Sequence, residues 1–116
     1  MPDKELDVST RCRFKNVAGG QASMDLHVAK AQVMRFMAQI EIPQQGSCHF
    51  DMKQFEQTAR MPNVVLTDKE STCTVRMWEQ GQEVTIAFSG CQSKCEQNAA
   101  NYLWPIVVDR RNGHCT

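Results

Sequence analysis

Long hydrophobic runs are absent from this sequence of 116 residues. A bilayer-spanning helix needs about 20 consecutive apolar residues, and no stretch approaches that length. Low-complexity tracts, internal repeats and linker-like segments are also missing, which argues against a disordered chain or several domains. We therefore expect residues 1–116 to form a single domain without a membrane span.

An excess of charge of either sign is lacking too. The chain carries 13 Lys and Arg residues against 13 Asp and Glu residues, so its formal net charge is zero. Nucleic acids and anionic membranes attract proteins through a net basic face. The balance argues against both as the main partner, and we expect a protein partner instead.

Catalytic and cofactor motifs are missing as well. No serine lies in a Gly-x-Ser-x-Gly turn, and no glycine-rich loop is present to cradle a phosphate. Cys91 and Cys95 lack the Cys-x-x-Cys spacing of a redox helix. His27, His49 and His114 lie in no nucleophile signature. We therefore predict that the protein is not an enzyme and holds no cofactor and no metal ion.

Cysteine, by contrast, is abundant for this length. The six cysteines are Cys12, Cys48, Cys73, Cys91, Cys95 and Cys115. They could be disulfides, metal ligands or free thiols, but zinc sites usually show two Cys-x2-Cys pairs, and none is present. We therefore favour disulfides, which persist in oxidising compartments and predict a periplasmic or secreted protein. Residues 1–4 carry no apolar signal segment, so we expect an exported form whose signal peptide has been removed.

Period-two alternation of apolar and polar residues dominates the N-terminal part. Residues 6–15 alternate as in a strand, and residues 16–20 are turn formers. Residues 24–42 are ambiguous, because they fit both a helical stripe capped by Ser23 and two alternating strands. We favour two strands joined near residues 29–32, ended by Pro43.

Two short helices are predicted between further strands. Asp51 is placed to cap a helix through Arg60, and residues 92–102 contain several helix formers, packed by Cys95 and Tyr102. Strands are expected at residues 48–50, 64–66 and 106–108. The expected fold is mainly β (α+β): an antiparallel sheet or small barrel with one or two short helices, stapled by disulfides.

The clearest local prediction is a β-hairpin over residues 73–89 with Gln80-Gly81 at its tip. This register sets Met77 opposite Val84, and Val75 opposite Ile86. It also sets Cys73 opposite Phe88, so that all six side chains share one buried face. Trp78 falls on the opposite, polar face.

The hairpin also suggests a disulfide pairing. Cys73 and Cys91 lie at its two ends, and a bend at Gly90 would bring them together. We prefer this pair together with Cys95–Cys115, which leaves Cys12 to join Cys48.

Two surface features are candidates for partner binding. The first is the tip formed by residues 109–114 around the Asn112-Gly113 turn, where Arg110, Arg111, Asn112 and His114 are either solvated or inserted into a partner's cleft. The second is Trp78, which is either an exposed binding aromatic or, as we favour, covered by residues 92–102.

Methionine is frequent, with seven residues. Met34 and Met37 beside His27 could bind Cu(I) through soft thioethers. The simpler interpretation, which we favour, is that Met34, Met37 and Met77 fill an irregular core.

The segment CTVRMWEQGQEVTIAFSGC, residues 73–91, followed by Cys95 and Tyr102, resembles a module of small exported proteobacterial proteins. Similar arrangements occur among periplasmic inhibitors of cell-wall lytic enzymes, including lysozyme inhibitors and immunity proteins. The Ser-Gly-x-Arg-Tyr loop of lysozyme inhibitors is absent, so no inhibitory residue is carried over. The resemblance implies a non-enzymatic periplasmic binding protein, an inhibitor or immunity protein acting on a peptidoglycan-degrading enzyme. Alternatives are a periplasmic metal-binding protein using Met, His or Cys, and an accessory subunit of an envelope complex.

Overall fold

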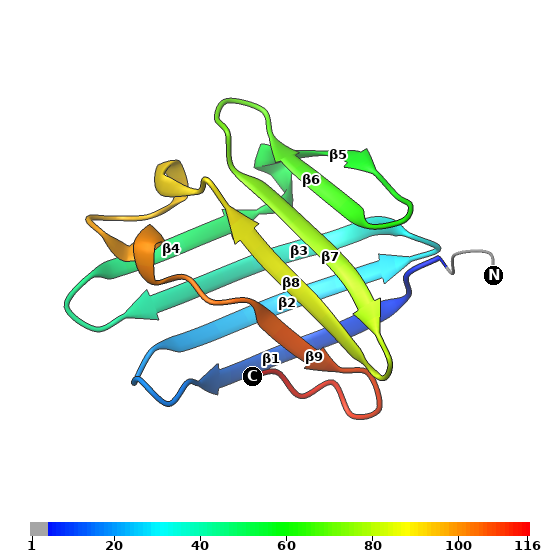
Figure 1. Ribbon diagram of the computed structural model, residues 1–116, viewed down its shortest axis with the longest axis horizontal. Helices are drawn as coiled ribbons and strands as arrows, with labels where there is room; N and C mark the ends of the chain where they lie inside the picture. The colour runs from blue at the N-terminus through cyan, green and yellow to red at the C-terminus, as the bar shows by residue number, and fades with distance from the viewer. Residues whose placement is uncertain (1–4) are drawn as a thin grey trace.

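Alternating strands form two antiparallel sheets that pack face to face (Figure 1). The protein was analysed as a computed structural model, which describes residues 5–116. Residues 1–4, on which the argument about a removed signal peptide rests, lie outside the described residues. The mainly β, disulfide-stapled fold is confirmed as two open sheets rather than a closed barrel. No helix within residues 5–116 is long and apolar enough to cross a membrane.

The first sheet has four strands in chain order. They are β1 (Val8–Lys15), β2 (Gln21–Ala29), β3 (Gln32–Ile42) and β4 (Gly46–Asp51). The two-strand interpretation of residues 24–42 is therefore confirmed. Alternate residues of β2 and β3 are buried, as expected for strands with one face on a core.

The turn between β2 and β3 carries no glycine or asparagine, although Lys30 and Ala31 both have positive φ angles of 49° and 63°. Such turns normally use Asn-Gly because a Cβ is strained there. Contacts from other segments hold this one. The Ala31 amide donates to the Leu6 carbonyl (2.8 Å), and the Lys30 amide donates to Asp7 Oδ1 (2.9 Å). The Gln57 side chain donates to the Ala31 carbonyl at 2.6 Å.

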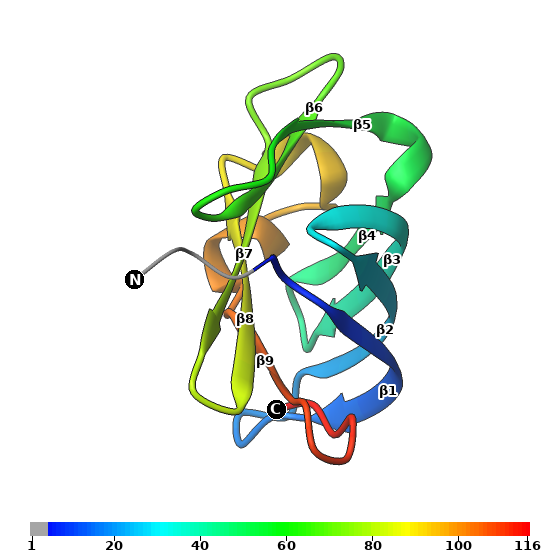
Figure 2. The same ribbon diagram turned by 90° about the vertical axis from the view of Figure 1, so that its right-hand side faces the viewer.

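The second sheet has five strands, also in chain order. They are β5 (Phe55–Ala59), β6 (Val64–Asp68), β7 (Thr74–Gln80), β8 (Glu83–Ser89) and β9 (Ile106–Asp109). Figure 2 shows the two sheets edge-on, with β7–β9 on one side and β1–β4 on the other. The apolar faces of both sheets meet between them in one core.

The helix predicted from Asp51 to Arg60 is wrong. Asp51 does act as a cap, since its Oδ1 accepts the Lys53 amide at 3.0 Å, but the helix is only the single 3-10 turn η1 (Met52–Gln54). The chain then becomes β5, because Phe55 packs against the core rings of Phe36 and Phe50 (centroids 6.4 Å apart in each pair). Tertiary packing overrides the local preference for a helix.

The second predicted helix, over residues 92–102, is present only as short, separate turns. Residues 92–102 form two 3-10 turns, η2 (Gln92–Lys94) and η3 (Ala99–Tyr102). Ala99 is fully buried, but Tyr102 is 54% exposed and does not pack the segment as expected. The disulfide from Cys95 to Cys48 holds this segment against β4 instead.

The β7–β8 hairpin has the predicted faces but a register shifted by two residues. Val75 pairs with Phe88 and Met77 with Ile86, and the tip is Gly81-Gln82. Gly81, with φ of 63°, takes the first central position of the turn, where its missing Cβ relieves strain. A shift of two keeps every side chain on its face, so Val75, Met77, Val84 and Ile86 are fully buried as expected. Phe88 is partly buried and stacks on Phe50.

The methionines separate into buried and exposed residues. Met77 is fully buried as predicted, whereas Met34 is 56% and Met37 49% exposed. The prediction that all three fill the core is therefore wrong. The register of β2 and β3 shifts beside His27, and Met37 lies on the outer face of the sheet.

Three disulfides use all six cysteines. Cys73–Cys91 is confirmed, with Gly90 bent at φ of 66°. The other two predicted pairs are wrong, because Cys12 joins Cys115 and Cys48 joins Cys95. Each of these bonds links a strand of the first sheet to a segment flanking the second. The sequence does not reveal which sheet edges meet, so it could not choose between these pairings.

Candidate functional site

The arginines of the 109–114 tip are already paired within the chain. Arg111 forms a bidentate pair with Asp109, with hydrogen-bond distances of 3.0 Å from Nε to Oδ1 and 2.8 Å from Nη2 to Oδ2. Hydrogen bonds from Arg111 are the main reason that the pKa of Asp109 is lowered to about 2. Arg110 Nη1 lies 2.6 Å from Glu79 Oε1. A partner carboxylate would therefore have to displace a carboxylate of the protein itself from each arginine.

The rest of the tip is tied to the scaffold. Asn112 Oδ1 accepts the His114 amide at 2.9 Å, and the Gly113 carbonyl accepts the Thr10 hydroxyl at 2.5 Å. The chain does return through His114, as the Asn112-Gly113 signal predicted, but the Asp109–His114 pair closes a wider turn of four residues. The structure thus gathers Arg110, Arg111, Asn112 and His114 in one exposed turn whose charges are internally satisfied.

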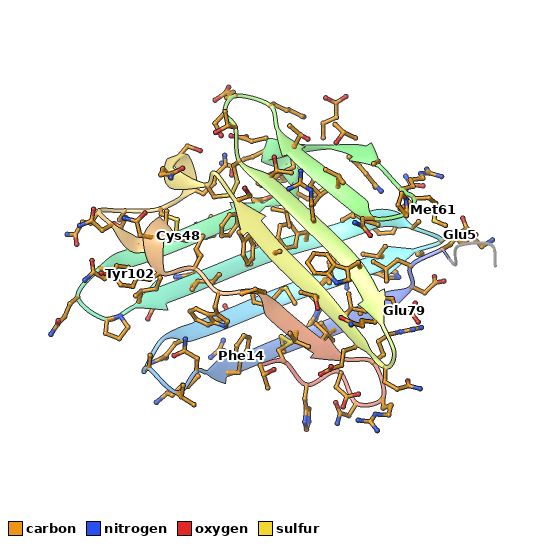
Figure 3. The ribbon with its side chains drawn as sticks, in the orientation of Figure 1. Glu5, Phe14, Cys48, Met61, Glu79 and Tyr102 are labelled. Carbon is orange, nitrogen blue, oxygen red and sulfur yellow. A yellow bond between two sulfur atoms is a disulfide. The ribbon has the colours of Figure 1, made fainter. Side chains whose placement is uncertain are left out.

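Trp78 lies elsewhere, on the outer face of the five-stranded sheet, and is half-buried. The prediction that residues 92–102 cover it is wrong, because η2 and η3 pack against β4 at the opposite end of the hairpin. Figure 3 makes the separation visible: Tyr102 of η3 and Glu79, the neighbour of Trp78, lie toward opposite ends of the molecule. Trp78 instead lines a hollow of about 500 Å³ together with Leu6, Pro62 and Asn63.

The outer face around Trp78 is mostly uncharged, and its charged residues other than Arg76 lie at the hairpin-tip end. Twelve residues of β6–β9 alternate with the buried ones. Four of them lie at strand ends, namely Gln80, Glu83 and Asp109 in the row at the hairpin tip and Ser89 at the end of β8. The other eight, here called the Trp78 face, are Val65, Thr67, Thr74, Arg76, Trp78, Thr85, Ala87 and Val107. Trp78 lies in a cross-strand row with Thr85 and Val107, and Arg76 lies between Val65 and Ala87.

Arg76 is the single charged residue among these eight. It is exposed, and its guanidinium forms no ion pair with any residue in the described part of the chain. It therefore differs from Arg110 and Arg111, whose charges are already paired. The two residue types most enriched at binding hot spots, Trp and Arg, are neighbours on this face and available to a partner.

Of the residues considered for Cu(I) binding, His27 and Met37 lie on the outer face of β2 and β3, where Met37 is opposite Asp25. His27 lies opposite Arg35, and His49 lies two strands away from His27 opposite Gln39. Among residues 5–116, no group of three His, Cys, Asp or Glu side chains could hold a metal ion. The cysteine sulfurs are all committed to disulfides.

A polar cluster that the sequence did not reveal links two loops around the Cys73–Cys91 bond; Asp68 and Lys94 are its buried members, whereas Ser93 is exposed. Lys94 Nζ lies 3.1 Å from Asp68 Oδ1, the Ser71 hydroxyl donates to the other carboxylate oxygen, and the Ser71 and Ser93 hydroxyls are 2.8 Å apart. The hydrogen bond from Ser71, supported by Lys94, lowers the pKa of Asp68, although burial opposes the shift.

Serine, lysine and aspartate can support nucleophilic chemistry, but only where a substrate has access. The Lys94 and Asp68 side chains are 10% and 2% exposed. The cluster therefore serves to hold the loops together. The sequence signal that could have found it is the polar stretch just before Cys73 and just after Cys91.

No family model, no curated protein and no solved structure matches this chain.

Proposed function

We propose that this protein is a non-enzymatic, exported binding protein that docks on a protein partner through the Trp78 face. The single observation that carries the proposal is the neighbouring pair of Trp78 and unpaired Arg76 on a face that is otherwise threonine, valine and alanine. The cores of protein interfaces are depleted of charge and enriched in Trp and Arg, and this face has that composition.

The hollow that Trp78 lines lies beside this face, because its other lining residues include the inward-facing Val64 and Met77 and Leu6 from the segment before β1. Pro62 and Asn63 form one wall and Gly81 borders it at the hairpin tip. A cavity of about 500 Å³ is large enough for one or two side chains of a partner. Anchors seated in such pockets contribute most of the binding energy at interfaces.

The scaffold suits a rigid binding surface. Three disulfides tie the two sheets and the hairpin base, so the face loses little conformational entropy when a partner binds. Disulfides of this number support a periplasmic or secreted location, since thiols are kept reduced in the cytosol. The resemblance of residues 73–102 to periplasmic inhibitors supports a peptidoglycan-degrading enzyme as the partner, bound by an inhibitor or immunity protein.

The test is capture of the partner by matched proteins. The disulfide-bonded protein is immobilised, exposed to periplasmic and culture extracts, and the retained proteins are assayed for peptidoglycan hydrolysis on a zymogram. Trp78→Ala should weaken binding of the captured enzyme by about 30-fold, because a central Trp anchor contributes about 2 kcal/mol. Arg111→Ala is the matched control and should retain the enzyme.

Three outcomes would contradict the proposal. Equal capture by the Trp78→Ala variant and the unchanged protein would remove the Trp78 face as the site. A captured partner that does not cleave peptidoglycan, or whose activity this protein does not inhibit, would contradict the proposed target class. Hydrolysis of peptidoglycan by the purified protein alone would remove the non-enzymatic assignment.

A further inference from the structure

The outer face of the four-stranded sheet contains a second hollow, of about 390 Å³. Side chains from all four strands line it, including Arg13 on β1, Ser23 on β2, Gln39 on β3 and His49 on β4. Figure 2 shows that this sheet lies opposite the five-stranded sheet, so this face points away from the Trp78 face. The two surfaces therefore share no lining residue.

These four side chains form one straight row across the sheet, because Arg13 pairs with Ser23, Ser23 with Gln39, and Gln39 with His49. Strands are spaced about 4.8 Å apart, so the row spans about 14 Å. None of the four side chains makes a hydrogen bond or ion pair with another residue of the described chain. The row, here called the Arg13 row, therefore presents a guanidinium, a hydroxyl, an amide and an imidazole to a ligand.

Charge favours an anion only at the β1 end of the row, because Glu41 and Asp51 flank its β3–β4 end. Asp25 is shared by two arginines, Arg11 (3.3 Å) and Arg35 (3.1 Å), which leaves that trio with a net positive charge. Arg13 and Lys15 add two more cations on β1 and have no carboxylate partner within residues 5–116. A carboxylate entering beside Arg13 would gain charge-assisted hydrogen bonds at little cost.

Other ligand classes fit this hollow poorly. A metal cation would be repelled by Arg11 and Arg13, although His49 and Met37 both line the site. Single-stranded nucleic acid binds through stacking on aromatic rings, and no Phe, Tyr or Trp lines the hollow. An extended peptide needs neither a cation-binding site nor aromatic rings. Its backbone can form hydrogen bonds with Ser23, Gln39 and His49. Met37, which is 49% exposed, offers it an adaptable apolar contact.

We propose that the Arg13 row binds a short, extended acidic peptide segment of a protein, with a carboxylate held by Arg13 at the β1 end. About four extended residues, at roughly 3.3 Å each, cover the length of the row. Arg13 anchors the acidic end, and the neutral groups of Ser23, Gln39 and His49 position the peptide backbone. This inference does not rest on the Trp78 face.

The probe is a fluorescein-labelled tetra-aspartate peptide, followed by anisotropy at low ionic strength, with the tetra-asparagine peptide as its uncharged counterpart. Arg13→Gln should weaken binding of tetra-aspartate by about tenfold. Arg60→Gln, which removes the same charge at the edge of the other sheet, is the matched control and should leave binding unchanged. Amide NMR shifts upon titration should concentrate at Ser23, Gln39 and His49.

Each contrary outcome is informative. Equal weakening by Arg60→Gln would show attraction by overall charge and overturn the site. If inorganic sulfate at matched ionic strength competes with tetra-aspartate as well as unlabelled peptide does, the row is a simple anion site. That result would overturn the proposal of a peptide ligand. Shifts confined to residues 109–114 would also overturn it. A thermal unfolding scan of Arg13→Gln checks that the fold is intact, and Ser23→Ala supplies a second variant in the row without a change of charge.

Discussion

The outer faces of the two sheets differ sharply, although their inner faces are equally apolar. Counted over whole strands, the outer face of β6–β9 carries three charged residues, Arg76, Glu83 and Asp109, whereas the outer face of β1–β4 carries seven. Those seven are Arg11, Arg13, Lys15, Asp25, Arg35, Glu41 and Asp51. A two-sheet sandwich needs only its inner faces to fold, so composition on the outer faces is free to serve binding. The difference indicates two surfaces suited to partners of different chemistry.

The largest expected effect separates the inner from the outer side of one strand. Phe50 of β4 is fully buried and stacks on Phe88 with centroids 4.6 Å apart, whereas its neighbour His49 is exposed. Phe50→Ala should lower the free energy of unfolding by about 4 kcal/mol through the cavity it leaves. His49→Ala should change it by less than about 0.5 kcal/mol. Urea unfolding curves measure both, and similar losses would mean that the faces are assigned wrongly.

A somewhat smaller effect distinguishes buried from surface ion pairs. Asp68→Asn leaves the Lys94 charge buried without its partner, so stability should fall by about 3 kcal/mol. Arg35→Gln breaks a solvated pair with Asp25 on the outer face and should cost less than about 1 kcal/mol. If chemical denaturation gives equal values, Lys94 and Asp68 are better solvated than the structure indicates.

Acid should weaken the fold through the same carboxylates. The pKa values of Asp68 and Asp109 are lowered in the folded protein, to about 2 for Asp109. A folded-state pKa below the unfolded value of about 4 gives stability that is complete above pH 4 and is lost as the pH falls toward 2. Unfolding free energies measured from pH 5 to pH 2 should show this decline, and Asp68→Asn should flatten it. A curve that stays level over that range would contradict the assignment.

The smallest expected effect concerns the arginine tip. Replacing Arg110 and Arg111 together by alanine should reduce partner affinity by less than threefold, because both side chains already bind Glu79 and Asp109. Surface plasmon resonance with the captured enzyme measures the change. A loss of 30-fold or more would return the binding site to the tip that the sequence first indicated.

Alternation was sufficient to predict much of the fold. The period of two correctly favoured two strands, β2 and β3, over a helix for residues 24–42. It also placed Trp78 and Val75 on opposite faces of the hairpin, although the observed register differs from the predicted one by two residues. What alternation could not predict came from contacts between distant segments. Phe55 entered a strand because the core rings of the other sheet receive it, and the Lys30-Ala31 turn is held by residues far along the chain.

The candidate sites were predictable to a smaller extent. Trp78 was identified from its place on the polar face, and Arg76 lies two residues before it in sequence. The pairing of Arg110 with Glu79 could not be predicted, because it depends on the register of β7, β8 and β9, which brings together residues 31 positions apart. The Arg13 row could not be predicted either, since it exists only once the register of four strands is known.

The most direct test of the central claim is hydrogen–deuterium exchange of the protein with and without its captured partner. Backbone amides in β7, β8 and β9 around Arg76, Trp78, Thr85 and Val107 should become more protected when the partner is bound, while the 109–114 tip changes little. Protection concentrated in residues 109–114, with the strands of the Trp78 face unchanged, would contradict the account.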